Sequence, residues 1–331
     1  MMANLRAGLV GLGMMGRHHA RNLRAIDGVD LVAVADAQGD PHGVADGLPV
    51  LPDVHALLAQ GLDYVVVAAP TMFHEEIGVA IAEAGVHALI EKPLAKTVEG
   101  ARLLVEAFGQ RGLVGAVGHI ERYNPALQQL RRRLEAGELG DVYQVITRRQ
   151  GPFPARIADV GVVKDLASHD IDLTAWVTQR DYEWVAARSV FKAGREYEDM
   201  VSATCTLSGG VISNHLVNWL TPSKERVTIV TGEKGMFVAD TLTADLTFYA
   251  NASVEQTWDD IARFRGVAEG NVTRFAIPKP EPLRTEHEHF RDAVLGKEAD
   301  IVTLTQGAQV VRVCEAMIES ARTNTFVDVR P

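Results

Sequence analysis

The segment from residue 7 to residue 25, AGLVGLGMMGRHHARNLRA, decides the fold, because an apolar run passes through a glycine-rich turn into a helical pattern. The turn reads G-L-G-M-M-G from Gly11 to Gly16, and Asp36 follows twenty residues after its last glycine. A strand, this glycine spacing, a helix and a later acidic residue are together typical of a βαβ unit that binds a dinucleotide. The sequence therefore predicts a dinucleotide site at this turn.

The three glycines and the aspartate of this motif each have a physical role. Gly11 permits the tight turn, Gly13 lets the main chain approach a pyrophosphate, and Gly16 allows the helix to pack closely on the strand. The N–H groups at the start of the helix and its dipole attract phosphate. Asp36 is expected to accept hydrogen bonds from ribose hydroxyls and to repel a 2′-phosphate, and Ala37 offers no neutralising guanidinium. The motif predicts NAD rather than NADP, and the alternative is a glycine turn with an unrelated aspartate.

The first 120 residues alternate short apolar runs with helical patterns, which is typical of a parallel sheet buried on both faces. The stripe of Ala101, Leu104, Val105 and Phe108 predicts a helix that packs one apolar face on this sheet. The predicted strands are residues 7–11, 31–36, 64–69, 86–91 and 113–118. We therefore predict an α/β fold with a doubly wound parallel sheet over residues 1–120.

Residues 121–331 have a different pattern and are predicted to form a second, α+β domain. A helix with Leu127, Leu130 and Leu134 on one face comes first, and two helices close the chain. Between them, β-rich runs separated by short turn signals favour antiparallel neighbours. These runs are residues 142–149, 184–191, 201–207, 211–220 and 227–231. Residues 251–282 have no sustained period and are predicted to leave the sheet.

Charge and cysteine content exclude several classes of partner. The 331 residues include 43 acidic and 33 basic side chains, and the net charge of -10 repels nucleic acids and anionic membranes. Cys205 and Cys314 are too few for a disulfide framework or a thiolate metal site. No apolar stretch approaches the roughly 18 residues of a membrane span, and four glycines interrupt the apolar N-terminal run, unlike a secretory signal. We expect a cytoplasmic protein with no nucleic-acid partner, no membrane partner and no bound metal.

A lysine lies at the end of the fourth predicted strand, in the tripeptide Glu91-Lys92-Pro93. Ligands of open α/β sheets bind at the edge formed by the carboxyl ends of the strands. A lysine at that edge can polarise a hydroxyl or carbonyl group and stabilise the oxygen charge that develops during hydride transfer. The alternative is an ordinary surface lysine.

A histidine and two carboxylates share one face of the helix predicted for D-L-A-S-H-D-I-D, residues 165–172. Asp165, His169 and Asp172 are spaced i, i+4 and i+7. A histidine with a carboxylate one turn away can act as a general base. The alternatives are a structural histidine and a His–Asp metal site, and the metal site lacks ligands because the pair His287 and His289 is more than a hundred residues away.

Four motifs in this order resemble the Gfo/Idh/MocA family, that is, the glucose–fructose oxidoreductase and inositol dehydrogenase family. They are the glycine turn, A-A-P-T-M-F-H at 68–74, E-K-P at 91–93 and the motif at 165–172. The resemblance covers nearly the whole chain. It implies an NAD-binding Rossmann domain over 1–120 and an open, mostly antiparallel sheet in 121–331 for substrate binding and oligomerisation. It also implies reversible oxidation of a secondary alcohol of a sugar or cyclitol by a homodimer or homotetramer.

The resemblance also assigns residues to the site. It implies that Lys92, His169 and Asp165 are catalytic and line the reaction centre. The cofactor contacts that it implies come from Gly11, Leu12, Gly13, Met14, Met15, Gly16, Asp36, Ala69, Pro70, Thr71, His74, Glu91 and Lys92.

Residues 118–127, 151–162 and 218–226 resemble the branch of this family that oxidises C3 of UDP-N-acetylglucosamine. Each segment includes an arginine, and an acidic protein needs local guanidinium groups to bind a diphosphate. These arginines are Arg122, Arg156 and Arg226. Substrate contacts are expected from Arg122, Tyr123, Asn124, Arg156, Lys92 and His169. A 3-ketosugar reductase, an inositol dehydrogenase and a noncatalytic NAD-binding regulator stay open as alternatives.

Overall fold

The computed structural model describes residues 4–153, 160–251 and 269–330, which form two compact units. The first unit contains the chain up to Ile120 and a later segment, Glu281–Glu315. The second contains most of residues 121–280 and the chain from Ala316 onward. The predicted division into residues 1–120 and 121–331 therefore omits the return of the chain to the first unit.

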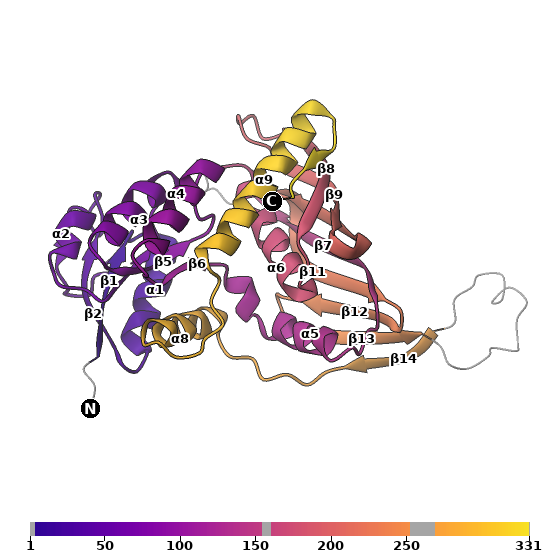
Figure 1. Cartoon of the computed structure of the whole chain (residues 1–331), viewed down its shortest axis with the longest axis horizontal. Helices are drawn as coiled ribbons and strands as arrows, with labels where there is room; N and C mark the ends of the chain where they lie inside the picture. The colour runs from indigo at the N-terminus through magenta and orange to yellow at the C-terminus, as the bar shows by residue number, and fades with distance from the viewer. Residues whose placement is uncertain (1–3, 154–159, 252–268, 331) are drawn as a thin grey trace, which may run out of the picture. The chain divides into compact units, whose positions relative to one another are not determined.

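The first unit is built on a six-stranded parallel sheet with the order β3-β2-β1-β4-β5-β6. Figure 1 labels β1, β2, β5 and β6 of this sheet and the helices α1 to α4 of the same unit. This order reverses between β1 and β4, which in doubly wound sheets is the point where ligands bind. The α/β fold predicted from the sequence is confirmed. The strands are β1 (Leu5–Val10), β2 (Val29–Ala35), β3 (Val50–Leu51), β4 (Tyr64–Val67), β5 (His87–Glu91) and β6 (Gly115–Gly118), and the helices between them are α1 (Met14–Ala25), α2 (Val54–Leu58), α3 (His74–Glu83) and α4 (Val98–Gly109).

Apolar side chains cover both faces of this sheet. Along β4, Val65 and Val67 belong to one buried cluster, and Tyr64 and Val66 belong to another. Successive side chains of a strand point to opposite faces, so each cluster covers one face. This arrangement explains why the strands read as continuous apolar runs rather than as alternating ones.

Two C-terminal helices begin in the segment that returns to the first unit. Helix α8 (Pro282–Val294) adds Phe290 to one apolar cluster, where its ring lies edge-on to Tyr64 at 5.4 Å between centroids. Helix α9 (Leu304–Thr323) adds Leu304 and Val311 to the other cluster. The two predicted closing helices are confirmed, and the first of them completes the core of the sheet that the N-terminal residues form.

The second unit is built on a nine-stranded sheet with the order β14-β13-β12-β11-β7-β10-β9-β8-β15. All neighbours are antiparallel except β7 and β10, so the predicted mostly antiparallel sheet is confirmed. The strands are β7 (Val142–Pro152), β8 (Tyr182–Val190), β9 (Met200–Leu207), β10 (Val211–Asn218), β11 (Leu220–Gly232), β12 (Gly235–Asp240), β13 (Asp245–Asn251), β14 (Glu269–Arg274) and β15 (Val327–Asp328).

Strand β14 corrects the prediction that residues 251–282 leave the sheet. It pairs with β13 at the edge of the sheet and has the sequence EGNVTR. An edge strand needs little apolar surface, and here Val272 is its only large apolar residue, so the sequence pattern had no period to detect.

Helices α5 (Pro125–Glu135) and α6 (Ser168–Thr178) also belong to the second unit, and a π-helical turn, Val163–Ala167, leads into α6. Leu127 and Leu130 of α5 are fully buried, as the predicted stripe requires. Among the residues that the structure describes, no helix has both the length and the apolar character needed to cross a membrane.

Candidate active site

The glycine turn lies at the carboxyl edge of the parallel sheet, between β1 and α1. Gly11 has φ of 93°, and a Cβ atom on it would lie 2.6 Å from the main chain of Ala68 and Ala69. A Cβ atom on Gly16 would lie 1.9 Å from the carbonyl oxygen of Gly11. A Cβ atom on Gly13 would meet nothing within 4 Å among the described residues. Gly11 and Gly16 thus serve the protein's own packing, whereas the space at Gly13 is open to a ligand.

The start of α1 offers main-chain N–H groups without a competing side chain. Gly13 is the N-cap residue, so no side chain caps the helix. Met14 is about half exposed and Met15 is partly buried in the first turn. The first turn of a helix with no side-chain cap is suited to bind phosphate oxygens.

Asp36 follows β2 and is partly exposed beside the glycine turn. Its Oδ2 accepts from the N–H of Leu12 at 2.8 Å, and its Oδ1 accepts from the N–H of Gln38 at 2.8 Å. These two bonds fix the carboxylate against the turn. Each carboxylate oxygen has a further lone pair that can accept a hydrogen bond from a ribose hydroxyl.

The loop after β4 carries Ala69, Pro70, Thr71 and His74, four of the predicted cofactor contacts. Ala69 is partly buried, Pro70 is exposed, and Thr71 begins a short 3-10 turn. His74 is almost fully buried, and its Nδ1 and Nε2 lie 2.9 Å from the carbonyl oxygens of Pro93 and Ala69. Burial lowers the pKa of His74. The ring therefore fixes the loop to the Lys92–Pro93 segment and is removed from the surface that a cofactor contacts.

Lys92 directly follows β5 and is partly buried. Its main-chain N–H donates to Oε2 of Glu91 at 3.1 Å. The carboxylate of Glu91 is buried, and its Oε1 lies 2.9 Å from Nε2 of His19 on α1. Burial alone would raise the pKa of Glu91, but the bond from His19 and the nearby Lys92 charge lower it overall. Glu91, a predicted cofactor contact, is instead directed into the protein.

The predicted catalytic motif of the second unit begins in the π-helical turn. Asp165 lies in this turn and is buried, and His169 lies on α6 and is partly exposed. Glu198 fixes the start of the turn, because its Oε1 accepts from the N–H of Val163 at 3.0 Å. Burial raises the pKa of Glu198. The regular helix assumed for residues 165–172 is thus wrong in its first turn, which is wider than an α-helical one.

Two buried arginines pair with the aspartates of α6. Arg122 donates to Asp172 through Nε at 2.9 Å and Nη2 at 2.6 Å, and both side chains are almost fully buried. Arg149 donates to Asp170 at 2.6 Å and to Glu121 at 2.8 Å. The prediction that Asp172 shares a polar face with His169 is therefore wrong, because Asp172 is buried and its charge neutralises Arg122. The same pairing gives Arg122 a structural role in place of the predicted substrate contact.

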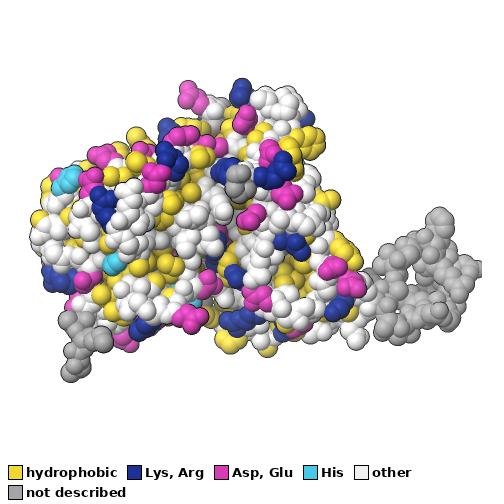
Figure 2. All heavy atoms as spheres, viewed as in Figure 1, with side chains coloured by type: hydrophobic (Ala, Val, Ile, Leu, Met, Phe, Trp, Pro, Cys, Tyr) yellow, Lys and Arg dark blue, Asp and Glu magenta, His cyan; other side chains and the backbone are white. Residues whose placement is uncertain are grey.

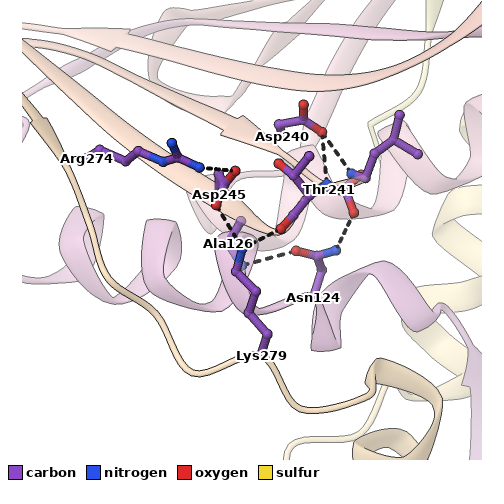
Figure 3. Close-up of polar contacts among 9 residues, drawn as sticks. Asn124, Ala126, Asp240, Thr241, Asp245, Arg274 and Lys279 are labelled. Atoms are coloured by element: carbon purple, nitrogen blue, oxygen red, sulfur yellow. Dashed lines mark hydrogen bonds and ion pairs between the residues drawn. The ribbon is translucent and has the colours of Figure 1, made fainter.

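Asn124 and Tyr123, the two predicted sugar contacts, are also buried. Asn124 is the N-cap of α5, where its Oδ1 accepts from the N–H of Ala126 at 3.1 Å. Its Nδ2 donates to the carbonyl oxygen of Thr241 at 3.0 Å, and Figure 3 shows the side chain directed at these two main-chain groups. Asn124 thus connects α5 to the end of β12, and its amide group is directed at the main chain rather than at a substrate. Arg156 lies outside the described residues.

Arg226, on β11, is partly exposed. Its Nη1 donates to the carbonyl oxygens of Gln150 at 2.6 Å and Glu225 at 2.8 Å. Burial lowers the pKa of Arg226 and the positive charge of Arg149 lowers it further, whereas three acidic groups, including Asp165, raise it. Arg226 therefore lies in the electrostatic environment of the candidate catalytic residues of its own unit.

The described residues on the visible face of the molecule form no cluster of charges of one sign (Figure 2). On the face that Figure 2 shows, basic and acidic side chains are interspersed. In the described parts of the chain, no group of three or more His, Cys, Asp or Glu side chains is arranged to hold a metal ion. His287, the distant histidine of the metal alternative, instead lies 2.8 Å from His19 through its Nε2.

Sequence reasoning missed the buried groups that support these residues. The ion pairs of Arg149 and Arg122 join segments 21 to 50 residues apart, and the contact of His19 with His287 spans 268 residues. Arg149 lies on the buried face of β7, and an arginine at the inward-facing positions of a strand is a local signal that such a pair exists, since an unpaired buried charge is very costly.

Comparison with known families agrees with this architecture. Residues 5–119 match a model described as an oxidoreductase family, NAD-binding Rossmann fold, named Gfo/Idh/MocA. Residues 127–238 match the model of the Gfo/Idh/MocA C-terminal domain. The two matches cover the N-terminal part of the first unit and most of the second sheet.

Individual relatives act on sugars and cyclitols. The chain is 36% identical to UDP-N-acetylglucosamine 3-dehydrogenase of Acidithiobacillus ferrooxidans over 64% of its own length and 66% of that protein. It is 32% identical to scyllo-inositol 2-dehydrogenase (NAD(+)) of Bacillus subtilis over 52% and 54% of the two chains. These sequence alignments thus span about half to two thirds of the relatives' lengths. A solved structure of the Acidithiobacillus enzyme aligns with a TM-score of 0.82 at 28% identity, over 97% of this chain and 99% of that one.

Proposed function

The chain belongs to the Gfo/Idh/MocA family of oxidoreductases, and we propose that it is an NAD-dependent dehydrogenase that oxidises a secondary alcohol of a sugar. The observation that carries this proposal is the sheet edge that the glycine turn shares with Lys92. Gly11 follows β1 and Lys92 follows β5, and both strands belong to one parallel sheet. Ligands of such sheets bind at this edge, so a lysine there is placed to contact a substrate that binds beside the dinucleotide.

The residues of the first unit fit NAD. The uncapped start of α1 and the open space at Gly13 suit a pyrophosphate, and Asp36 can accept from the ribose hydroxyls. The charge of Asp36 disfavours a 2′-phosphate, which supports NAD over NADP. NAD, when bound, supplies the acceptor for the hydride at C4 of its nicotinamide.

The chemistry assigned to the protein is proton transfer and charge stabilisation. As the alcohol carbon gives up a hydride, its hydroxyl gives up a proton, and a carbonyl group forms. His169 takes this proton, with Asp165 stabilising the charged ring, and the ammonium group of Lys92 stabilises the oxygen. Lys92 is the alternative proton acceptor. The order of the two motifs, which is that of the family, supports their joint action.

The substrate that we propose is UDP-N-acetylglucosamine or a related nucleotide sugar, oxidised at C3. The relative at 36% identity supports this choice, and Arg226 is a partly exposed guanidinium suited to a phosphate group. The inositol dehydrogenases support a free cyclitol as the second candidate. A 3-ketosugar reduced with NADH is the same chemistry in the opposite direction.

Formation of NADH tests the proposed activity. Purified protein is mixed with NAD and, in parallel, with UDP-N-acetylglucosamine, myo-inositol, scyllo-inositol and free sugars, and the NADH absorbance is recorded. A 3-ketosugar with NADH tests the reverse direction. The nucleotide sugar is expected to give the highest kcat/KM. Tight NAD binding without turnover on any substrate would instead support a noncatalytic regulator.

Two variants test the assigned residues. Lys92→Ala and His169→Ala are each expected to lower kcat by about 10²-fold to 10⁴-fold, the usual range for a lost acid–base group. Lys96→Ala and His55→Ala are the matched controls, because both of these side chains are exposed. Unchanged turnover in Lys92→Ala and His169→Ala would contradict the proposed site.

The proposal includes a homodimer or homotetramer that forms through the second sheet. Tyr143, Ile212 and Val272 lie on strands of this sheet, and about half of each side chain is exposed. Exposed apolar side chains on a sheet are suited to burial between copies of a chain. Light scattering coupled to size-exclusion chromatography measures the mass, and a monomer would contradict this part of the proposal.

A further inference from the structure

Three buried side chains from distant parts of the sequence form a chain of hydrogen bonds behind Lys92. Nε2 of His287, on α8, lies 2.8 Å from Nδ1 of His19, on α1. Nε2 of His19 lies 2.9 Å from Oε1 of Glu91, at the end of β5. The three residues are 1%, 0% and 8% exposed, respectively. The dehydrogenase chemistry described above uses neither histidine.

The hydrogen positions follow from the chemistry of the groups. Glu91 is ionised, because the pKa of its carboxyl is lowered, and so it only accepts. Nε2 of His19 therefore donates to Glu91, and a second hydrogen bond joins Nδ1 of His19 to Nε2 of His287. Burial and the proximity of His19 lower the pKa of His287 far below its usual value, which keeps that ring neutral. His19 thus donates to Glu91 and is itself held by the neutral ring of His287.

Glu91, which the two histidines hold in place, in turn contacts the main chain of Lys92. Its second oxygen, Oε2, accepts from the main-chain N–H of Lys92 at 3.1 Å. Gly118 makes room for the carboxyl group, because a Cβ atom there would lie 3.1 to 3.2 Å from it. From the other side, His74 contacts the carbonyl oxygen of Pro93 at 2.9 Å. The main chain on both sides of the Lys92 side chain is therefore fixed by buried polar groups.

We propose that His19 and His287 are positioning residues, which orient the carboxylate of Glu91 and through it the segment that carries the catalytic Lys92. The inference rests on the proposed function, since Lys92 is catalytic only there. It also gives the return of α8 to the first unit a role beyond packing. Without His19, Glu91 loses the donor on Oε1 and is left a buried carboxylate with too few hydrogen bonds, so it must turn or take up a proton. Either change displaces the N–H of Lys92.

Kinetics of matched variants test the positioning role. His19→Leu and His287→Leu should lower kcat by about 10-fold to 100-fold, as small misplacements of reacting groups do, while KM for NAD changes less than about 2-fold. His19→Gln and His287→Gln should recover kcat to within about 3-fold, because an amide both donates and accepts in the way that a neutral imidazole does. His18→Leu, an exposed neighbour on the same helix, is the control and should leave kcat unchanged. Equal losses of kcat in the Leu and Gln variants, in proportion to a lower Tm, would overturn the proposal.

Amide hydrogen exchange measured by NMR separates this inference from the proposed function. The N–H of Lys92 should exchange at least about 10-fold faster in His19→Leu than in the wild type, and at nearly the wild-type rate in His19→Gln. The N–H of Leu9, in the central strand β1, reports on global stability and should change far less. If no substrate is turned over but Lys92 exchange responds in this way, the proposed function fails and the positioning chain stands. If Lys92 exchange is the same in all variants, the positioning chain is overturned even in an active enzyme.

Discussion

The two units build their candidate sites by different means. In the first unit, the glycine turn and Asp36 act through main-chain groups, and Asp36 accepts from the N–H groups of Leu12, 24 residues away, and of Gln38. In the second unit, the helix that carries His169 is fixed by ion pairs between segments 21 to 50 residues apart. The first site is thus built from main-chain contacts around one glycine motif, whereas the second depends on buried charged side chains that pair only in the folded chain.

The largest effect is expected where one of these buried pairs is broken. Asp172→Ala leaves the guanidinium of Arg122 buried without its partner, which typically costs about 3 to 5 kcal/mol of the free energy of unfolding. Urea unfolding followed by circular dichroism measures this loss. The double variant Arg122→Met with Asp172→Leu removes both charges and should recover most of the stability.

A surface pair supplies the control for this experiment. Glu106→Ala removes the partner of Arg102 on the exposed face of α4 and should leave the urea midpoint nearly unchanged, since exposed pairs contribute little. An Asp172→Ala variant as stable as Glu106→Ala would show that the second unit does not depend on buried charges, and the contrast between the units would fail.

The second unit also contains a buried histidine that makes its stability depend on pH. Nδ1 of His215 lies 2.8 Å from Oγ1 of Thr147, and its Nε2 lies 3.1 Å from the hydroxyls of Tyr182 and Ser213. Burial lowers the pKa of His215 to about 4. The unfolded chain, with a pKa of about 6.5, then binds the proton first, so the free energy of unfolding falls as the pH drops from about 6.5 to about 4. The expected loss is about 3 kcal/mol.

His215→Gln isolates this contribution from that of His287. The variant keeps a donor and an acceptor but cannot be charged in this range, so the stability difference between wild type and variant should shrink by about 3 kcal/mol between pH 7 and pH 4. Urea unfolding at several pH values measures it, with the exposed His55→Gln as the control. A difference that is constant with pH would show that His215 is not kept neutral by burial.

Two glycine variants sharpen the description of the first unit. An alanine in a helix usually stabilises it by about 1 kcal/mol relative to glycine. In Gly16→Ala the new Cβ atom would lie 1.9 Å from the oxygen of Gly11, and such overpacking typically costs about 1 to 3 kcal/mol. In Gly13→Ala the new Cβ atom would meet no atom of the described residues within 4 Å, so its Tm should fall less than that of Gly16→Ala while its affinity for NAD falls. Fluorescence titration and thermal unfolding separate the two effects, and unchanged NAD affinity in Gly13→Ala would contradict the cofactor site.

The buried parallel strands of the first unit explain how well its sequence predicts it. Its central strands are buried on both faces, so each reads as an apolar run, and only the two-residue edge strand β3 escaped prediction. The role of Glu91 was predicted incorrectly, because a motif shows that a carboxylate is present but not which way it points. Its partners His19 and His287 are 72 and about 200 residues away and share no pattern with it.

The second unit shows where sequence reasoning fails. The strands β7 to β10 were predicted from β-rich runs separated by turn signals. Arg122 and Asn124 were assigned to a substrate because they lie in the segment 118–127, which resembles the UDP-N-acetylglucosamine branch. Both are buried by partners that lie 50 and 117 residues away. The ion pairs of Asp245 with Arg274 and Lys279, also drawn in Figure 3, depend likewise on segments about 30 residues apart.

The smallest expected effect concerns the choice between the two dinucleotides. Asp36→Asn removes the negative charge beside the ribose, so the preference for NAD over NADP, measured as a ratio of kcat/KM values, should fall about 10-fold, which corresponds to about 1.4 kcal/mol. Asp40→Asn is the matched control, because Asp40 also accepts two main-chain N–H groups, those of Val44 and Ala45, at 2.8 and 2.7 Å. Both variants lose similar loop contacts, but only Asp36 borders the glycine turn. An equal fall in both would mean that loop order selects the cofactor, whereas a fall confined to Asp36→Asn assigns the selection to the charge of Asp36.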